Sequence, residues 1–184
     1  MTVIRPAIPA DVPTITRIYA EAVRTGTASF ELDPPDEAEM AARMRALLAG
    51  GFPYLAAEIN GALAGYAYAG HYRTRPAFRF TVEDSIYIAP AMQRRGIGRA
   101  LLAALIEDSA RRGFRQMVAV IGDPERQQPS VVLHQAAGFR RLCVLDDIGF
   151  KHGRWLDSML MQRALGEGAA TAPADAEPAC PPSP

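Results

Sequence analysis

The chain has 184 residues, of which 49% are hydrophobic and 22% are charged, a composition that favours one folded domain with a sizeable core over a disordered or fibrous protein. Lys plus Arg and Asp plus Glu number 20 each, so no overall charge indicates nucleic acid or a membrane surface as the main partner. No apolar run is long enough to span a bilayer and no basic-then-apolar leader opens the chain, so we expect a cytoplasmic protein.

The last part of the chain differs in composition from the rest. From Gly166 onward it contains Ala, Pro, Gly and acidic residues without a large apolar side chain, so it cannot bury enough surface to offset the entropy of ordering. We therefore expect a domain over residues 1–165 and a disordered Pro- and Ala-rich tail over residues 166–184. Cys143, in an expected strand, and Cys180, in the tail, form neither a disulfide framework nor a metal site, and no metal is expected.

Strands and helices alternate in the first half of the predicted domain. Apolar residues recur at helical spacing between Ile15 and Val23, which predicts an amphipathic helix that stops before Gly26. Two apolar runs flank Asn60-Gly61, a sequence that suits a two-residue turn with positive φ, so an antiparallel hairpin is predicted. The expected elements of this half are a strand at residues 3–4, helices at 11–25 and 35–48, and hairpin strands at 54–59 and 63–68.

The second half begins with a strand, a glycine-containing loop, a helix and another strand. Residues 80–88 are rich in β-branched and aromatic side chains and predict a central strand. The following helix carries Leu101 and Leu105 on one face, and with the strand at 117–121 it forms a βαβ unit with an expected right-handed crossover. A helix at 130–137 and strands at 139–145 and 155–161 complete an α/β (α+β) fold with a mixed sheet.

The loop after the central strand suits an anion. Glycines let backbone N–H groups approach phosphate oxygens, and the N-terminus of the next helix adds partial positive charge. Arg94, Arg95 and Arg99 add full charges. The loop lacks the Gly-Lys-Ser/Thr ending of ATP-binding loops and the third glycine of a dinucleotide fingerprint. Taken alone, it indicates either anion binding or a plain turn before a helix.

The loop sequence Gln93-Arg94-Arg95-Gly96-Ile97-Gly98 matches the Gln/Arg-x-x-Gly-x-Gly/Ala signature of the GCN5-related N-acetyltransferase (GNAT) family. Between residues 3 and 163 the chain resembles one branch, the phosphinothricin and methionine sulfoximine acetyltransferases. Besides Tyr19, the segments that carry this resemblance are residues 27–31, 81–88, 118–122, 133–139 and 151–157. The resemblance implies the GNAT fold, a central mixed, mostly antiparallel sheet flanked by helices. It also implies transfer of an acetyl group from acetyl-CoA to the primary amine of a small amino-acid-like substrate.

The family's mechanism implies roles for the central strand and the loop. Glu83 would act as the base for the amine, directly or through water, unless it is only a strand carboxylate paired with an arginine. Ile86, Tyr87 and Ile88 would pair through their backbone with the pantetheine arm of CoA, and the N–H of Ile88 would stabilise the oxyanion. The residues expected to hold the pyrophosphate are Arg94, Arg95, Gly96, Ile97, Gly98 and Arg99.

The motifs do not decide which residue acts as the general acid. Many relatives have a tyrosine where this chain has His134, which could protonate the CoA thiolate, bond to the cofactor or only pack within its helix. Ser130, at the start of the same helix, is expected to contact the cofactor. The family's asparagine after the preceding strand is absent, and Gln127 or Gln128 could substitute for it.

A basic loop precedes Glu83 and matches the branch's substrate-binding stretch. Arg73 and Arg75 could hold a carboxylate, phosphinate or sulfoximine group through paired hydrogen bonds. The alternative interpretation is that this segment is only a solvated surface loop. Phe30 and residues 151–155 are expected to close the pocket. The residues expected to contact the substrate are Phe30, Arg73, Thr74, Arg75, Glu83, Asp84 and Ser85.

The resemblance further implies a homodimer whose partner molecule is a small amine, without nucleic acid or membrane, and a role in detoxification. Two other functions fit the same motifs. Acetylation of protein N-termini or lysines would favour an open groove over an enclosed pocket. A CoA-binding module without catalysis is the other alternative, and the presence of Glu83 argues against it.

Overall fold

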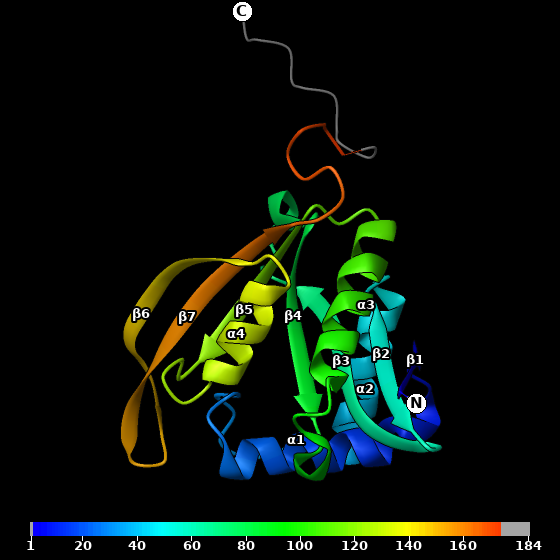
Figure 1. Cartoon of the computed structure of the whole chain (residues 1–184), viewed down its shortest axis with the longest axis vertical. Coiled ribbons are helices and arrows are strands. Elements are labelled where there is room, and N and C mark those ends of the chain that lie inside the picture. The colour runs from blue at the N-terminus through cyan, green and yellow to red at the C-terminus, as the bar shows by residue number, and fades with distance from the viewer. Residues whose placement is uncertain (1, 174–184) are drawn as a thin grey trace, which may run out of the picture.

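The computed structural model describes residues 2–173 and forms a seven-stranded sheet with helices on both of its faces (Figure 1). The strand order is β1-β2-β3-β4-β5-β7-β6, and every neighbouring pair is antiparallel except β4 and β5. The predicted mixed, mostly antiparallel sheet is therefore confirmed. The elements are β1 (Thr2–Pro6), α1 (Val12–Thr25), α2 (Glu37–Ala49), β2 (Tyr54–Ile59), β3 (Ala62–His71), β4 (Thr81–Ile88), α3 (Ile97–Arg111), β5 (Gln116–Gly122), α4 (Gln128–Ala136), β6 (Arg140–Lys151) and β7 (Arg154–Ala164).

The predicted turn between β2 and β3 is confirmed, because Asn60 and Gly61 both have positive φ, 51° and 78°. The predicted bounds of the last two strands were wrong. β6 continues to Lys151, and its register against β7 shifts between Leu145 and Gly149. Turn-forming residues in that stretch indicated the end of a strand, but a β-bulge accommodates them and the strand continues.

Two apolar cores lie on opposite faces of the sheet. Leu101 of α3 and Val131 of α4 are fully buried on one face, and Ile15 and Val23 of α1 are fully buried on the other. Because side chains alternate along a strand, Ile86 and Ile88 of β4 pack toward α3, whereas Tyr87 packs toward α1. Residues 83, 85 and 87 therefore share the α1 face.

Residues 166–173 follow β7 and lie against Arg115, whose Nη2 donates to Thr171 Oγ1 at 3.1 Å and to the Ala172 carbonyl at 3.3 Å. The first part of the expected tail is thus in contact with the domain. The remainder of that tail, residues 174–184, lies outside the described residues.

Cys143 is an exposed free thiol on β6, and Cys180 falls outside the part of the chain that the structure describes. None of the helices within residues 2–173 combines the length and apolar character that a bilayer crossing requires.

Candidate active site

The two parallel strands at the centre of the sheet separate at Glu83. β4 and β5 pair from Thr81 opposite Gln116 to Glu83 opposite Val118, and β4 then continues alone on this side as far as Ile88. Figure 1 shows the two strands diverging toward the end of the molecule along which α1 runs. The second half of β4 therefore offers backbone groups on its β5 side to an extended ligand.

Hydrogen bonding to β3 decides which of these backbone groups are free. The N–H of Ala89 donates to the carbonyl of Ala64 at 2.9 Å, and the antiparallel register continues through Tyr87. Alternate residues of an antiparallel strand point their N–H and C=O groups to opposite neighbours. The backbone of Tyr87 therefore faces β3, and only Ile86 and Ile88 of the three expected cofactor contacts direct backbone groups into the opening.

Glu83 is half-buried and carries an available carboxylate. Within residues 2–173 it takes part in no ion pair and accepts no side-chain hydrogen bond, so the arginine-paired alternative has no support. Burial, with a smaller effect from the charge of Asp84, raises the pKa of Glu83 to about 7. Such a carboxylate is suited to accept a proton near neutral pH.

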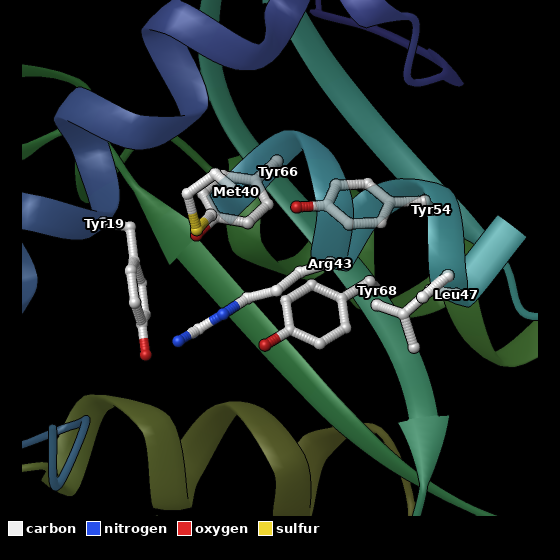
Figure 2. Close-up of a pocket in the computed structure, with 8 residues that line it drawn as sticks. Tyr19, Met40, Arg43, Leu47, Tyr54, Tyr66 and Tyr68 are labelled. Atoms are coloured by element: carbon white, nitrogen blue, oxygen red, sulfur yellow. The ribbon is translucent and has the colours of Figure 1, made fainter. Parts of the chain in front are cut away.

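A cavity of about 300 Å³ lies on the same face of the sheet as Glu83. Its lining consists mainly of aromatic and apolar side chains from α1, α2, β2 and β3, namely Tyr19, Met40, Arg43, Ala46, Leu47, Tyr54, Tyr66 and Tyr68. Figure 2 shows the hydroxyl groups of Tyr19 and Tyr68 and the guanidinium of Arg43 pointing to the same side of this cavity. Tyr68 is opposite Ser85, one strand position along the shared face from Glu83.

Tyr66 contributes a polar atom without a partner to this cavity. Its hydroxyl is fully buried and forms no hydrogen bond among the described residues. Burial raises the pKa of Tyr66 well above its ordinary value, so the hydroxyl keeps its proton and remains a donor. An aromatic cavity with a buried unpaired donor suits a small ligand that has both apolar and polar parts.

The sequence prediction missed the residues that form this cavity. Tyr66 and Tyr68 alternate along β3 and Tyr54 is their neighbour on β2, so the period-two pattern of tyrosines was a usable signal. Arg43 gave no such signal, because its position on α2 identifies it only as an exposed helical residue.

The loop between α1 and α2 is anchored from several directions. The hydroxyl groups of Tyr19 and Ser29 lie 3.0 Å apart, and Lys151 Nζ donates to the carbonyl of Ser29 at 2.8 Å. Arg43 Nη1 donates to Glu31 Oε1 at 2.6 Å. The loop therefore connects the lining of the aromatic cavity described above, which we call the tyrosine cavity, with the β6–β7 hairpin.

Phe30, in the same loop, packs where two glycines leave room for its ring. A Cβ atom added at Gly122 would lie 2.5 Å from the Phe30 ring, and one added at Gly149 would also collide with it. Trp155, which was expected near the substrate, is instead 60% exposed and packs edge-on against Phe150. Of the expected pocket-closing residues, Phe30 and Lys151 hold the loop and Trp155 lies on the surface.

Asp84 and His134 form a buried pair on the other face of the sheet. His134 Nε2 lies 3.0 Å from Asp84 Oδ2, and His134 Nδ1 lies 2.7 Å from the carbonyl of Ser130. Burial alone would lower the pKa of His134, but the hydrogen bond and charge of Asp84 outweigh it, and the pKa is raised. A carbonyl and an ionised carboxylate both accept, so both ring nitrogens are placed to donate, which favours the imidazolium form of His134 over the neutral form.

This pair bears on two expected roles. Both ring nitrogens of His134 are within hydrogen-bond distance of protein acceptors, so neither is free to protonate a thiolate. Of the three roles considered for His134, the geometry favours packing within its helix. Asp84 points toward α4, away from the face that holds Glu83 and Ser85, so the structure does not bring it to the expected substrate contacts. The oxygen Asp84 Oδ1 is buried without a hydrogen-bond partner among residues 2–173.

The expected pyrophosphate loop has the geometry of an anion site. Gly96 is the N-cap of α3 with φ 79°, and the preceding Arg94 also has positive φ, 59°. These conformations turn the chain sharply into the helix, so the first N–H groups of α3 are unpaired within the helix. Arg94, Arg95 and Arg99 are exposed around this helix start.

The expected substrate-binding loop lies between β3 and β4, at the end of β4 nearer Glu83. The guanidinium of Arg73 lies 5.3 Å from the centre of the Tyr72 ring and 5.9 Å from that of Phe78. Thr74 and Arg75 are exposed. Neither Arg73 nor Arg75 forms an ion pair with any other described residue, so both charges are available.

Known proteins resemble the chain over most of its length. The model of the acetyltransferase (GNAT) family matches residues 15–139. Phosphinothricin N-acetyltransferase of Alcaligenes faecalis is 53% identical over 163 residues, 89% of this chain and 82% of that protein. L-methionine sulfoximine/L-methionine sulfone acetyltransferase of Salmonella typhimurium is 40% identical over 91% of this chain and 96% of that protein. A phosphinothricin acetyltransferase from Sinorhizobium meliloti, solved in complex with AcCoA, has a TM-score of 0.92 and 48% identity, covering 95% of this chain and 94% of that one.

Proposed function

Because the chain belongs to the acetyltransferase (GNAT) family, we propose that it transfers the acetyl group of acetyl-CoA to the amino group of a small amino-acid-like molecule. Phosphinothricin and methionine sulfoximine, the substrates named for its relatives, are the first candidates. The observation that carries the proposal is the separation of β4 from β5 at Glu83, whose pKa is raised to about 7.

The backbone of β4 supplies the contacts for the acetyl donor. Ile86 and Ile88 direct unpaired N–H and C=O groups into the opening, where an extended pantetheine arm can pair with them. The N–H of Ile88 is the proposed donor to the oxyanion that forms during transfer. Beyond Ile88, the start of α3 and Arg94, Arg95 and Arg99 offer charges for the pyrophosphate.

Glu83 is the proposed base. Ile88 follows it by five residues, about 17 Å along an extended strand, so proton transfer from an amine near Ile88 proceeds through bridging water molecules. The attacking nitrogen must lose a proton. A carboxylate with a pKa near neutral is partly ionised at neutral pH and can therefore accept that proton. His134, with both ring nitrogens engaged, has a positioning role between α4 and β4 in this proposal.

The acceptor is proposed to lie on the α1 face of the sheet. The tyrosine cavity offers apolar surface and the hydroxyl of Tyr66, and the β3–β4 loop offers the charges of Arg73 and Arg75. Guanidinium groups hold planar or tetrahedral oxyanions through paired hydrogen bonds, which fits the acid groups of the candidate substrates. A cavity of about 300 Å³ has the size of a small-molecule site, which favours a small acceptor over a protein segment.

A homodimer is also proposed, with β6 at its interface. β6 is the edge strand of the sheet, and its exposed apolar side chains include Val144, Ile148 and Phe150. Exposed apolar patches on an edge strand are typical of contact surfaces. Light scattering after gel filtration should give a dimer mass for the wild-type protein and a monomer mass for Val144→Lys, and a monomeric wild-type protein would refute this part of the proposal.

The function can be tested by acetyl-CoA-dependent release of free thiol. Phosphinothricin, methionine sulfoximine, ordinary amino acids and short peptides are compared at equal concentration. We expect turnover with the first two and little with peptides. Turnover of peptides alone would replace the acceptor assignment with protein acetylation. Binding of CoA without release of its thiol in the presence of any of these amines would indicate a CoA-binding module instead of an enzyme.

A further inference from the structure

A second cavity of about 400 Å³ lies outside the proposed active site. It is bounded by the C-terminal end of α1, by the loop between β5 and α4 and by the turn between β6 and β7. The basic residues of its lining come from all three segments and are Arg24, Arg126, His152 and Arg154. Segments that are far apart in the sequence thus bring several cationic or titratable groups to one place.

The charges in this cavity are not balanced. Arg154 is paired with Asp123, but Arg24 and Arg126 form no ion pair with any residue between 2 and 173. The other acidic residue of the β5–α4 loop, Glu125, is exposed and does not line the cavity. Like charges brought together repel, so an anion bound between them would relieve an unfavourable energy.

Asp123 holds the segments that bound the cavity together. Asp123 is 5% exposed, and besides Arg154 it accepts a hydrogen bond from Thr27 Oγ1 at 2.9 Å. Its carbonyl accepts from the N–H groups of Arg126 and Gln127 at 3.0 Å and 2.9 Å. The loop that carries Arg126 is therefore fixed relative to α1 and β7, which reduces the ordering needed when a ligand binds.

We infer that this cavity, which we call the arginine pocket, is a binding site for a phosphate group. Two guanidinium groups without acid partners match the oxygens of a phosphate through paired, charge-assisted hydrogen bonds. The side-chain amide of Gln127, next to Arg126, adds a neutral donor at the same volume.

Phosphate could reach the arginine pocket from two sources. One is the 3′-phosphate on the ribose of acetyl-CoA, because α3, whose start is the proposed pyrophosphate site, and α4, which follows Gln127, begin at the same end of the molecule (Figure 1). The other is free inorganic phosphate. The chemistry of the pocket is the same in both cases.

The test must keep phosphate away from the pyrophosphate loop. The protein is first saturated with 3′-dephospho-CoA, which occupies that loop and leaves the arginine pocket empty, and inorganic phosphate is then titrated by calorimetry. We expect saturable binding to the wild-type protein and binding at least about tenfold weaker in Arg24→Gln/Arg126→Gln. Arg17→Gln, on the exposed face of the same helix as Arg24, is the matched control and should bind as the wild type does.

A comparison of CoA with 3′-dephospho-CoA identifies the source. If the cofactor supplies the phosphate, CoA binds more tightly than 3′-dephospho-CoA to the wild-type protein and this preference is lost in the double variant. If free phosphate is the ligand, the preference is the same in both proteins while the phosphate titration still differs. Equal phosphate binding by wild type and double variant, or no saturable binding to the folded wild type, would overturn the inference.

Discussion

Glu83 stands opposite Val118 at the last position where β4 and β5 run side by side. Glu83, whose pKa is raised to about 7, is therefore also the residue at which the sheet opens. Because burial is the main cause of that pKa, the activity and the stability of the protein should depend on the same carboxylate.

The first prediction concerns turnover. Glu83→Gln should lower kcat by about 100-fold or more, the usual effect of losing a general base, with the KM for acetyl-CoA changed by less than about threefold. In the wild type, kcat/KM should rise with pH through an apparent pKa of about 7, and this limb should disappear in the variant. Steady-state thiol release across pH measures both, with the exposed Glu21→Gln as control. Unchanged turnover would exclude Glu83 as the base.

The second prediction concerns stability. The folded state raises the pKa of Glu83 from 4.5 to about 7, so its contribution to stability is full below the unfolded value and is lost as pH rises through the folded value. Glu83→Gln should therefore be more stable than the wild type by about 1–2 kcal/mol near pH 8 and equal to it near pH 4, allowing for partial solvent exposure. Urea unfolding at the two pH values measures this difference. An equal effect at both would contradict the assignment.

The third prediction separates positioning from acid catalysis at His134. His134→Gln removes the partner of a buried carboxylate and should destabilise the protein by about 3 kcal/mol, while the folded fraction keeps kcat within about fivefold of wild type. Because the pKa of His134 is raised from 6.5, the stability due to the pair should be present below 6.5 and decline as pH rises through the folded value.

Adding Asp84→Asn to the His134→Gln variant removes the unpaired charge and should recover part of the lost stability, as a double-mutant cycle can show. A fully folded His134→Gln protein whose kcat has fallen as far as that of Glu83→Gln would instead make the imidazolium a catalytic acid.

The fourth prediction compares two glycines of the pyrophosphate loop. Gly96 has φ 79°, so Gly96→Ala should cost about 1 kcal/mol of stability. Gly98 has no positive φ, and an added Cβ would meet Leu133 only at 3.4 Å, so Gly98→Ala should alter stability little. The family signature allows alanine at this position, so Gly98→Ala should also bind CoA as the wild type does. Thermal unfolding and CoA titration compare the two variants, and a larger loss of stability in Gly98→Ala than in Gly96→Ala would contradict this prediction.

Sequence patterns predicted the parts of the molecule that depend on local periodicity or on short motifs. The order of strands and helices, the Asn60-Gly61 turn and the position of Glu83 on the central strand all follow from such patterns. The extension of β6 to Lys151 did not, because the bulge that permits it depends on pairing with β7. The pairing of Asp84 with His134 was also missed, since it joins residues fifty positions apart across a packed interface.

Phe30 fills the volume that side chains at Gly122 and Gly149 would otherwise need. The three positions thus share one fixed space, although they lie in three separate segments of the chain. Shortening Phe30 would leave room for a methyl group at Gly149 but not at Gly122, where an added Cβ would still lie 2.7 Å from the carbonyl oxygen of Thr27. Homologues with alanine or serine at position 149 should therefore carry a smaller residue in place of Phe30 while keeping glycine at position 122, a covariation that an alignment of such sequences would reveal.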